Sequence, residues 1–425
     1  MRYSTIEPSF FVENRKQLIA LLPENTLSIF HSNPIYPTNA DGVLPFKQNS
    51  DLFYFSGIDQ EETILLLCPH ASNPAYREIL FILESNEHLI TWEGYKLTKK
   101  QASELSGVAT VLWTSEFDKI VRQLAIESSG IALLQNEHMR SDNHIPTLND
   151  MLVEHCKKSF PLHQFHRLAP LCAALRVKKK AQEVEQIKIA SRITYNAFLG
   201  AARTLQPGCK EYEIEAIIHY HFLKNGSRGP AYASIIASGN NANVLHYTQN
   251  DMECKSGDLV LMDFGAEYGN YNADLTRVLP VDGTFTERQK AYYEGVLKIF
   301  KEVKKEYKPG KTFKELNQLA GSVCTEVCLD LGIVTKEEVQ QNPLIYRKYF
   351  MHGVGHHLGL DVHDVHPVNH TLEPGMILTL EPGIYNKEEG IGIRLENDIL
   401  ITDTGYEDLM DFIPLEIKDI EDIMA

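Results

Sequence analysis

The sequence predicts an α+β protein with an α/β N-terminal domain and a larger C-terminal domain that mixes helices and strands. Before about residue 172, short apolar runs alternate with polar and helical stretches, which is typical of an α/β domain. After it, helical segments are followed by strand-like segments twice over. A chain of 425 residues is long enough for two to three domains. We therefore expect domains at 1–172 and 173–425.

The N-terminal domain is expected to form its sheet from apolar runs at residues 63–68, 79–83 and 130–134. Leu168, Ala169 and Pro170 then suggest a joint. The basic residues that follow are interpreted as the solvated start of a helix, because the chain as a whole is acidic.

The C-terminal domain opens with two predicted helices. Apolar residues three to four apart predict a helix from Ala181 that ends before Pro207, and a second helix covers about 211–223. Two further helical segments fill roughly 286–332, and strands are expected at 376–380 and 391–396.

Two aspartates lie in a predicted β-hairpin. An apolar run leads into Asp263, a second strand carries Asp274, and Tyr268, Gly269 and Asn270 supply the turn. A two-residue turn centred between Tyr268 and Gly269 would make the aspartates direct neighbours, and a Gly269–Asn270 turn would make them diagonal neighbours. A three-residue turn would place them on opposite faces. The alternative is that both aspartates are simply exposed to solvent. The apolar run that precedes Asp263 disfavours this alternative.

A histidine- and glycine-rich segment follows at residues 352–363, where four histidines are interrupted by three glycines. This pattern is not a helix face, and glycine allows close approach of the backbone. The strand at 376–380 then ends at Glu381. In the strand at 391–396, Arg394 and Glu396 share one face and could form the wall of a site.

Asp263, Asp274, His356, Glu381 and Glu396 together form a ligand set suited to two divalent metals. Oxygen-rich ligation with a single imidazole suits Mn²⁺, Co²⁺, Zn²⁺ or Fe²⁺. Two metals that share carboxylates activate water for hydrolysis. The residues therefore predict a metallohydrolase.

These segments also resemble the motifs of the Xaa-Pro aminopeptidase (aminopeptidase P) and prolidase family, which has the pita-bread fold of methionine aminopeptidase and creatinase. The resemblance is carried by residues 246–248, 262–265, 274–277, 352–363, 381–383 and 394–398, with residues 45–57 resembling the start of the family's N-terminal domain. It implies a pita-bread catalytic domain of two pseudo-symmetric halves, with the metals between them. It also implies a homo-oligomer, a dimer or tetramer.

The resemblance further implies a role for each site residue. Asp263 binds the first metal, Asp274 and Glu396 bridge both, and His356 and Glu381 complete the second, with Mn²⁺ favoured. Glu381 would move a proton from the bridging water to the leaving nitrogen. The family's other histidines and the neighbouring polar residues would contact substrate or line the site: His246, His352, His363, Arg394 and, more weakly, Tyr385.

Three functions remain open. The first is an aminopeptidase that removes the residue before a proline at the second position of a peptide. The second is a prolidase restricted to dipeptides, and the third is a binding protein that has lost catalysis. The N-terminal domain favours the aminopeptidase, and so does Trp92, which lies in a segment that resembles the family's loop toward the active site. In that segment Lys96 replaces the arginine that is usual in the family. Trp92 could instead be a packed or interface residue. Five competent ligands disfavour the binding protein.

Composition limits the partners and the location. A net charge of −16 disfavours nucleic acid and anionic membranes. The seven cysteines include no C-x-x-C pair, which disfavours a disulfide framework or thiolate zinc site. With no secretory signal pattern and no apolar run approaching eighteen residues, we expect a cytoplasmic protein.

Overall fold

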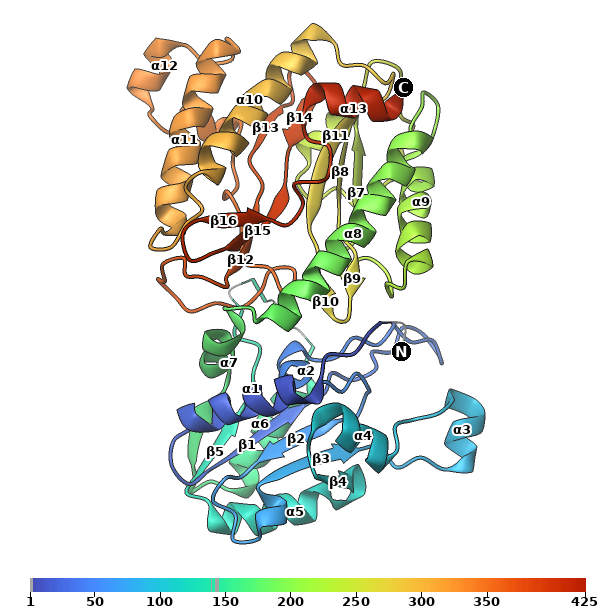
Figure 1. The fold of residues 1–425 in the computed structure, drawn as a ribbon, viewed down its shortest axis with the longest axis vertical. Helices are drawn as coiled ribbons and strands as arrows, with labels where there is room; N and C mark the ends of the chain where they lie inside the picture. The colour runs from blue at the N-terminus through green and yellow to red at the C-terminus, as the bar shows by residue number, and fades with distance from the viewer. Residues whose placement is uncertain (1–2, 139, 142–144) are drawn as a thin grey trace. The chain divides into compact units, whose positions relative to one another are not determined.

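The computed structural model describes residues 3–138, 140–141 and 145–425 (Figure 1). The chain divides into two compact units, Ser4–Arg176 and Val177–Ala425, with Tyr3 packing on the second. Ala169 and Pro170 do not form a joint but begin helix α7 (Ala169–Arg176), since proline is tolerated in the first turn of a helix.

The N-terminal unit contains a six-stranded sheet of order β4-β3-β2-β1-β5-β6. The central β1 pairs antiparallel with β2 and parallel with β5, so the sheet is mixed. Its strands are β1 (Thr26–His31), β2 (Ile64–Leu67), β3 (Glu78–Ile82), β4 (Thr110–Trp113), β5 (Gly130–Leu133) and β6 (Gln164–Arg167). Its helices, besides α7, are α1 (Pro8–Leu21), α2 (Ser50–Ser56), α3 (Glu87–Glu93), α4 (Lys99–Ser106), α5 (Phe117–Glu127) and α6 (Leu148–Ser159).

The C-terminal unit repeats one order of elements, two long helices and then strands. The first repeat comprises α8 (Ala181–Thr204), α9 (Glu211–Lys224), β7 (Ile235–Ser238), β8 (Leu259–Phe264), β9 (Glu267–Tyr268), β10 (Tyr271–Asn272) and β11 (Leu275–Pro280). The second comprises α10 (Glu287–Lys304), α11 (Phe313–Asp330), α12 (Lys336–Gln341), β12 (Ile377–Leu380), β13 (Gly383–Asn386), β14 (Ile391–Arg394), β15 (Asn397–Ile401) and β16 (Tyr406–Asp408), and α13 (Ile417–Met424) ends the chain. In Figure 1, α8 and α9 flank the strands of this unit on one side, and α10 and α11 flank them on the other.

The aspartate hairpin turns at Gly269 and Asn270, both of which have positive φ. Tyr268 therefore faces Tyr271, and further along the ladder Asp263 faces Thr276. Asp274 lies two positions from that partner, so the two aspartates are diagonal neighbours on one face.

The predicted strand at 391–396 ends earlier, at Arg394, and the next strand, in another sheet, begins at Asn397. β14 pairs with β13, whereas β15 pairs with β12 and β16. Between them, the backbone N–H of Leu395 donates to Pro382 and that of Glu396 donates to Thr276. The segment changes partners there, which sets Glu396 beside β11.

Trp92 lies on α3 and is 77% exposed, so in the described chain it is not a packed residue. Lys96 forms ion pairs with Glu61 and Glu93 of its own unit. All seven cysteines are free and buried. Among the described residues, no helix has the length and apolar character needed to cross a bilayer.

Candidate metal centre and active site

Five elements of the C-terminal unit bring the predicted ligands together. Asp263 lies on β8, Asp274 just before β11, Glu381 directly after β12, and Glu396 between β14 and β15. His356 Nε2 lies 3.5 Å from Asp274 Oδ2 and 3.7 Å from Glu381 Oε1. Ligand atoms of Asp274, His356 and Glu396 all lie within 4.8 Å of one another. We call these five residues the carboxylate centre.

The backbone alongside β12 positions His356. Thr379 N donates to His356 O at 2.8 Å, and His356 N donates to Thr379 Oγ1 at 3.0 Å. A Cβ at Gly355 would lie 2.1 Å from the Thr379 carbonyl oxygen, so the approach requires glycine. This close pairing brings the His356 ring within reach of Glu381.

The His356 ring is oriented by its own chain. His356 Nδ1 lies 3.0 Å from the carbonyl oxygen of His357, which can only accept, so Nδ1 carries the proton. Nε2 then points toward Asp274 and Glu381, where it would bind a metal ion in its unprotonated form. Metal-binding histidines are held in this way by a backbone acceptor.

Three side chains donate hydrogen bonds to the carboxylates of the centre. The Tyr232 hydroxyl is 2.5 Å from Asp263 Oδ1 and also donates to Asp274. Thr276 Oγ1 donates to Glu396 Oε2 at 2.6 Å. Arg394 donates to Asp263 and, through Nε, to Thr276 Oγ1 at 3.1 Å.

The histidines and the tyrosine expected near the site also lie there. His352 Nε2 is 2.9 Å from the Tyr385 hydroxyl, and that hydroxyl accepts from Arg394 Nη1 at 2.8 Å. The His363 ring lies 4.1 Å from that of His356. His246 is exposed and lowers the pKa of His352 through its charge, after the larger effects of burial and Arg394.

The carboxylate centre gathers four carboxyl groups that are largely shielded from solvent. Burial raises the pKa of Glu381 to about 7 and the pKa of Glu396 well above its ordinary value, and Asp274 raises the latter further. Burial also raises the pKa of Asp263, against the lowering effect of Arg394. Burying carboxylates this close together is unfavourable unless cations compensate them. The donor set therefore fits divalent metal ions.

Tyr232 and Thr276 belong to the site, although the sequence did not suggest a role for Tyr232. It follows Gly229, Pro230 and Ala231 in a segment without periodicity, so no local pattern signals it. Thr276 lies within the segment 274–277 that resembles a family motif, without a role of its own there. Asp398, two residues after Glu396, is buried and accepts from the Asp274 backbone N–H at 3.2 Å.

Comparison with known proteins identifies the family. The model of metallopeptidase family M24 matches residues 185–403, and that of the aminopeptidase P N-terminal domain matches residues 11–132. The chain is 33% identical to an Xaa-Pro aminopeptidase of Escherichia coli over 99% of both chains. It is 34% identical to an Xaa-Pro dipeptidase of Rattus norvegicus over 61% of this chain.

Solved structures agree. A variant of E. coli aminopeptidase P in complex with substrate superposes with a TM-score of 0.90, at 32% identity, covering 99% of each chain. The expected pita-bread fold with an added N-terminal domain is confirmed, as is the expected metallopeptidase class, which implies divalent metal ions. The chain thus belongs to metallopeptidase family M24, among the members that carry an aminopeptidase P N-terminal domain.

Proposed function

We propose that the protein is an Xaa-Pro aminopeptidase that uses two divalent metal ions, most favourably Mn²⁺. The observation that carries the proposal is the convergence of four carboxylates with Nε2 of His356. The full-length similarity to the E. coli Xaa-Pro aminopeptidase supports the substrate class.

Each ligand has a place in this proposal. Asp263 would hold one ion, His356 and Glu381 would hold the other, and Asp274 and Glu396 would contribute to both. When bound, the two ions would polarise the scissile carbonyl and acidify water. An Xaa-Pro bond is a tertiary amide without an N–H, which makes strong polarisation useful.

Glu381 is the proposed proton carrier. Its carboxylate would take a proton from the attacking water and give it to the prolyl nitrogen as the peptide bond breaks. Burial raises the pKa of Glu381 to about 7 in the metal-free protein, and bound cations would lower it, which leaves the carboxylate deprotonated and able to accept a proton.

The remaining polar residues are proposed to bind substrate. His246, His352 and His363 would hydrogen-bond the scissile carbonyl oxygen and stabilise its developing charge. Arg394 would act on substrate binding indirectly, because its guanidinium donates hydrogen bonds to Asp263 and to the Tyr385 hydroxyl and so positions both.

A prolidase is the alternative, since it would use the same five ligands. The N-terminal unit disfavours it, because residues 11–132 match the aminopeptidase P domain. A cytoplasmic homo-oligomer, dimer or tetramer, remains part of the proposal and is testable by light scattering and fractionation.

The deciding experiment compares rates with Mn²⁺-loaded protein on an Xaa-Pro dipeptide and an Xaa-Pro-Yaa-Yaa tetrapeptide, with a chelated control. We expect fast release of the N-terminal residue from the tetrapeptide. Cleavage of the dipeptide alone would identify a prolidase. No cleavage of either peptide, with metal shown to be bound, would refute the enzyme proposal.

A further inference from the structure

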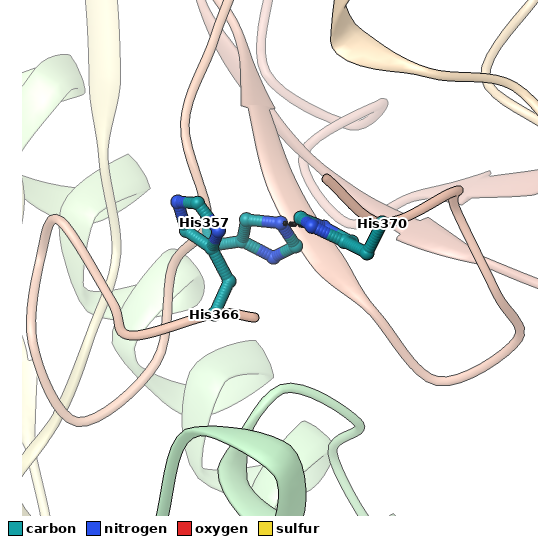
Figure 2. Close-up of side chains that lie close together, drawn as sticks. All are labelled: His357, His366 and His370. Carbon is teal, nitrogen blue, oxygen red and sulfur yellow. Dashed lines mark hydrogen bonds between the residues drawn. The ribbon is translucent and has the colours of Figure 1, made fainter. Parts of the chain in front are cut away.

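A second group of metal-binding side chains lies outside the carboxylate centre, in the segment that leads into β12. His357, His366 and His370 place ring nitrogens within 4.8 Å of one another (Figure 2). The ring centroids of His357 and His366 are 4.7 Å apart, and those of His366 and His370 are 5.0 Å apart. We call these three residues the histidine cluster.

One backbone carbonyl orients two of the rings. The Nδ1 atoms of His366 and His370 lie 3.0 Å and 2.7 Å from the carbonyl oxygen of Pro367. Because a carbonyl only accepts, both Nδ1 atoms carry protons, and both Nε2 atoms keep free lone pairs. This outer-shell arrangement is the one that holds metal-binding histidines in place.

The third ring is buried and incompletely bonded. His357 is 1% exposed, and its Nε2 lies 2.7 Å from His370 Nε2, the bond drawn in Figure 2. His370 Nε2 has no proton, so His357 Nε2 must donate and His357 Nδ1 is left bare. That Nδ1 atom is buried without a hydrogen-bond partner, an arrangement that costs about 1–3 kcal/mol. The cluster thus brings together ring nitrogens whose lone pairs are not all used by the one hydrogen bond between His357 and His370.

We propose that the histidine cluster is a separate binding site for one Zn²⁺ ion, held by a ring nitrogen from each of His357, His366 and His370. Three imidazoles without a carboxylate suit Zn²⁺ far better than Mn²⁺. To bind through Nε2, His357 would take the other tautomer, with its proton moved to the bare Nδ1. Two nitrogens on one tetrahedral Zn²⁺ lie ~3.3 Å apart, so His357 Nε2 and His370 Nε2 would separate by about half an ångström. His366 and His370 are only partly buried, which leaves room for this shift and for a water as fourth ligand.

The test measures Zn²⁺ binding to the full-length protein and to a variant carrying His366→Ala and His370→Ala. His155→Ala, which removes an exposed imidazole from α6, is the matched control. By equilibrium dialysis against Zn²⁺ with elemental analysis, the parent and the control should each bind one more zinc ion than the double variant. Affinity for that ion should fall at least ~100-fold, since even outer-shell changes alter metal affinity 10- to 100-fold.

A cobalt titration gives a second measurement that does not depend on activity. Tetrahedral Co²⁺ with nitrogen ligands absorbs visible light more strongly than Co²⁺ in an oxygen-rich site of higher coordination. This band should appear in the parent and the control and be lost in the double variant. Equal zinc content and equal cobalt spectra in a folded double variant would overturn the proposal. The outcome is independent of peptidase activity, so either proposal can fail alone.

Discussion

Two neighbouring residues, His356 and His357, belong to groups of opposite chemistry. The first faces four carboxylates, and the second faces two other imidazoles. In each group a backbone carbonyl fixes a histidine tautomer. The carbonyl of His357 does so for His356, and the carbonyl of Pro367 does so for His366. The orienting device is shared, so the surrounding donors decide which metal each group prefers.

The largest expected effect is on turnover at the carboxylate centre. Replacing Glu381 by alanine or glutamine should lower kcat ~10³-fold or more, because the proposed proton carrier is lost. Metal analysis of each variant must accompany the kinetics, since Glu381 is also a proposed ligand. Zinc bound at the histidine cluster should be unchanged, which would separate the two groups.

Near-normal rates in a metal-loaded Glu381 variant would refute the proton-carrier role. Loss of metal together with loss of activity in both variants would support a ligand role only. The glutamine variant is the more discriminating one, because it keeps the size of the side chain.

A smaller effect is expected on the stability of metal-free protein, which should change with pH. Its size is of the order of 3 kcal/mol, at ~1.4 kcal/mol per pKa unit. Burial raises the pKa of Glu381 to about 7 from 4.5. The folded chain therefore binds this proton more tightly than the unfolded chain. Its contribution is fully present below about pH 4.5 and is lost as pH rises through 7, and Glu396 acts in the same direction.

Urea unfolding of chelator-treated protein between about pH 5 and pH 8 measures this effect. Buried histidines such as His31 and His352, whose pKa burial lowers, oppose this trend in the parent and in Glu381→Gln alike. The free energy of unfolding of the parent relative to Glu381→Gln should therefore fall with rising pH. Adding Mn²⁺ should restore most stability at the higher pH, because metals bind the deprotonated carboxylates. No pH dependence in that difference would show that burial does not raise the pKa of Glu381.

The sequence predicted which side chains gather at the carboxylate centre better than it predicted their surroundings. Apolar runs that end in acids identify Asp263 and Glu381, because a strand and the residue after it are local features. The hairpin register stayed open among three turns, and the positive φ of Gly269 and Asn270 selects one of them. The end of the predicted strand at Arg394, before Glu396, depends on distant partners of the next two residues, Pro382 and Thr276, that no local pattern shows.

The smallest expected effect concerns Tyr232, which has no counterpart in the histidine cluster. Its hydroxyl donates to both aspartates, so Tyr232→Phe leaves each carboxylate without that donor and freer to turn. Mn²⁺ affinity should fall ~10-fold, about 1.4 kcal/mol, as expected for an outer-shell contact. Tyr220→Phe, which removes a half-exposed hydroxyl on α9, is the matched control. Calorimetric titration with Mn²⁺ measures the carboxylate centre, and titration of the Mn²⁺-loaded protein with Zn²⁺ measures the histidine cluster. A loss confined to Mn²⁺ supports a positioning role for Tyr232, whereas an equal loss for both metals would mean that the substitution disturbs the whole unit.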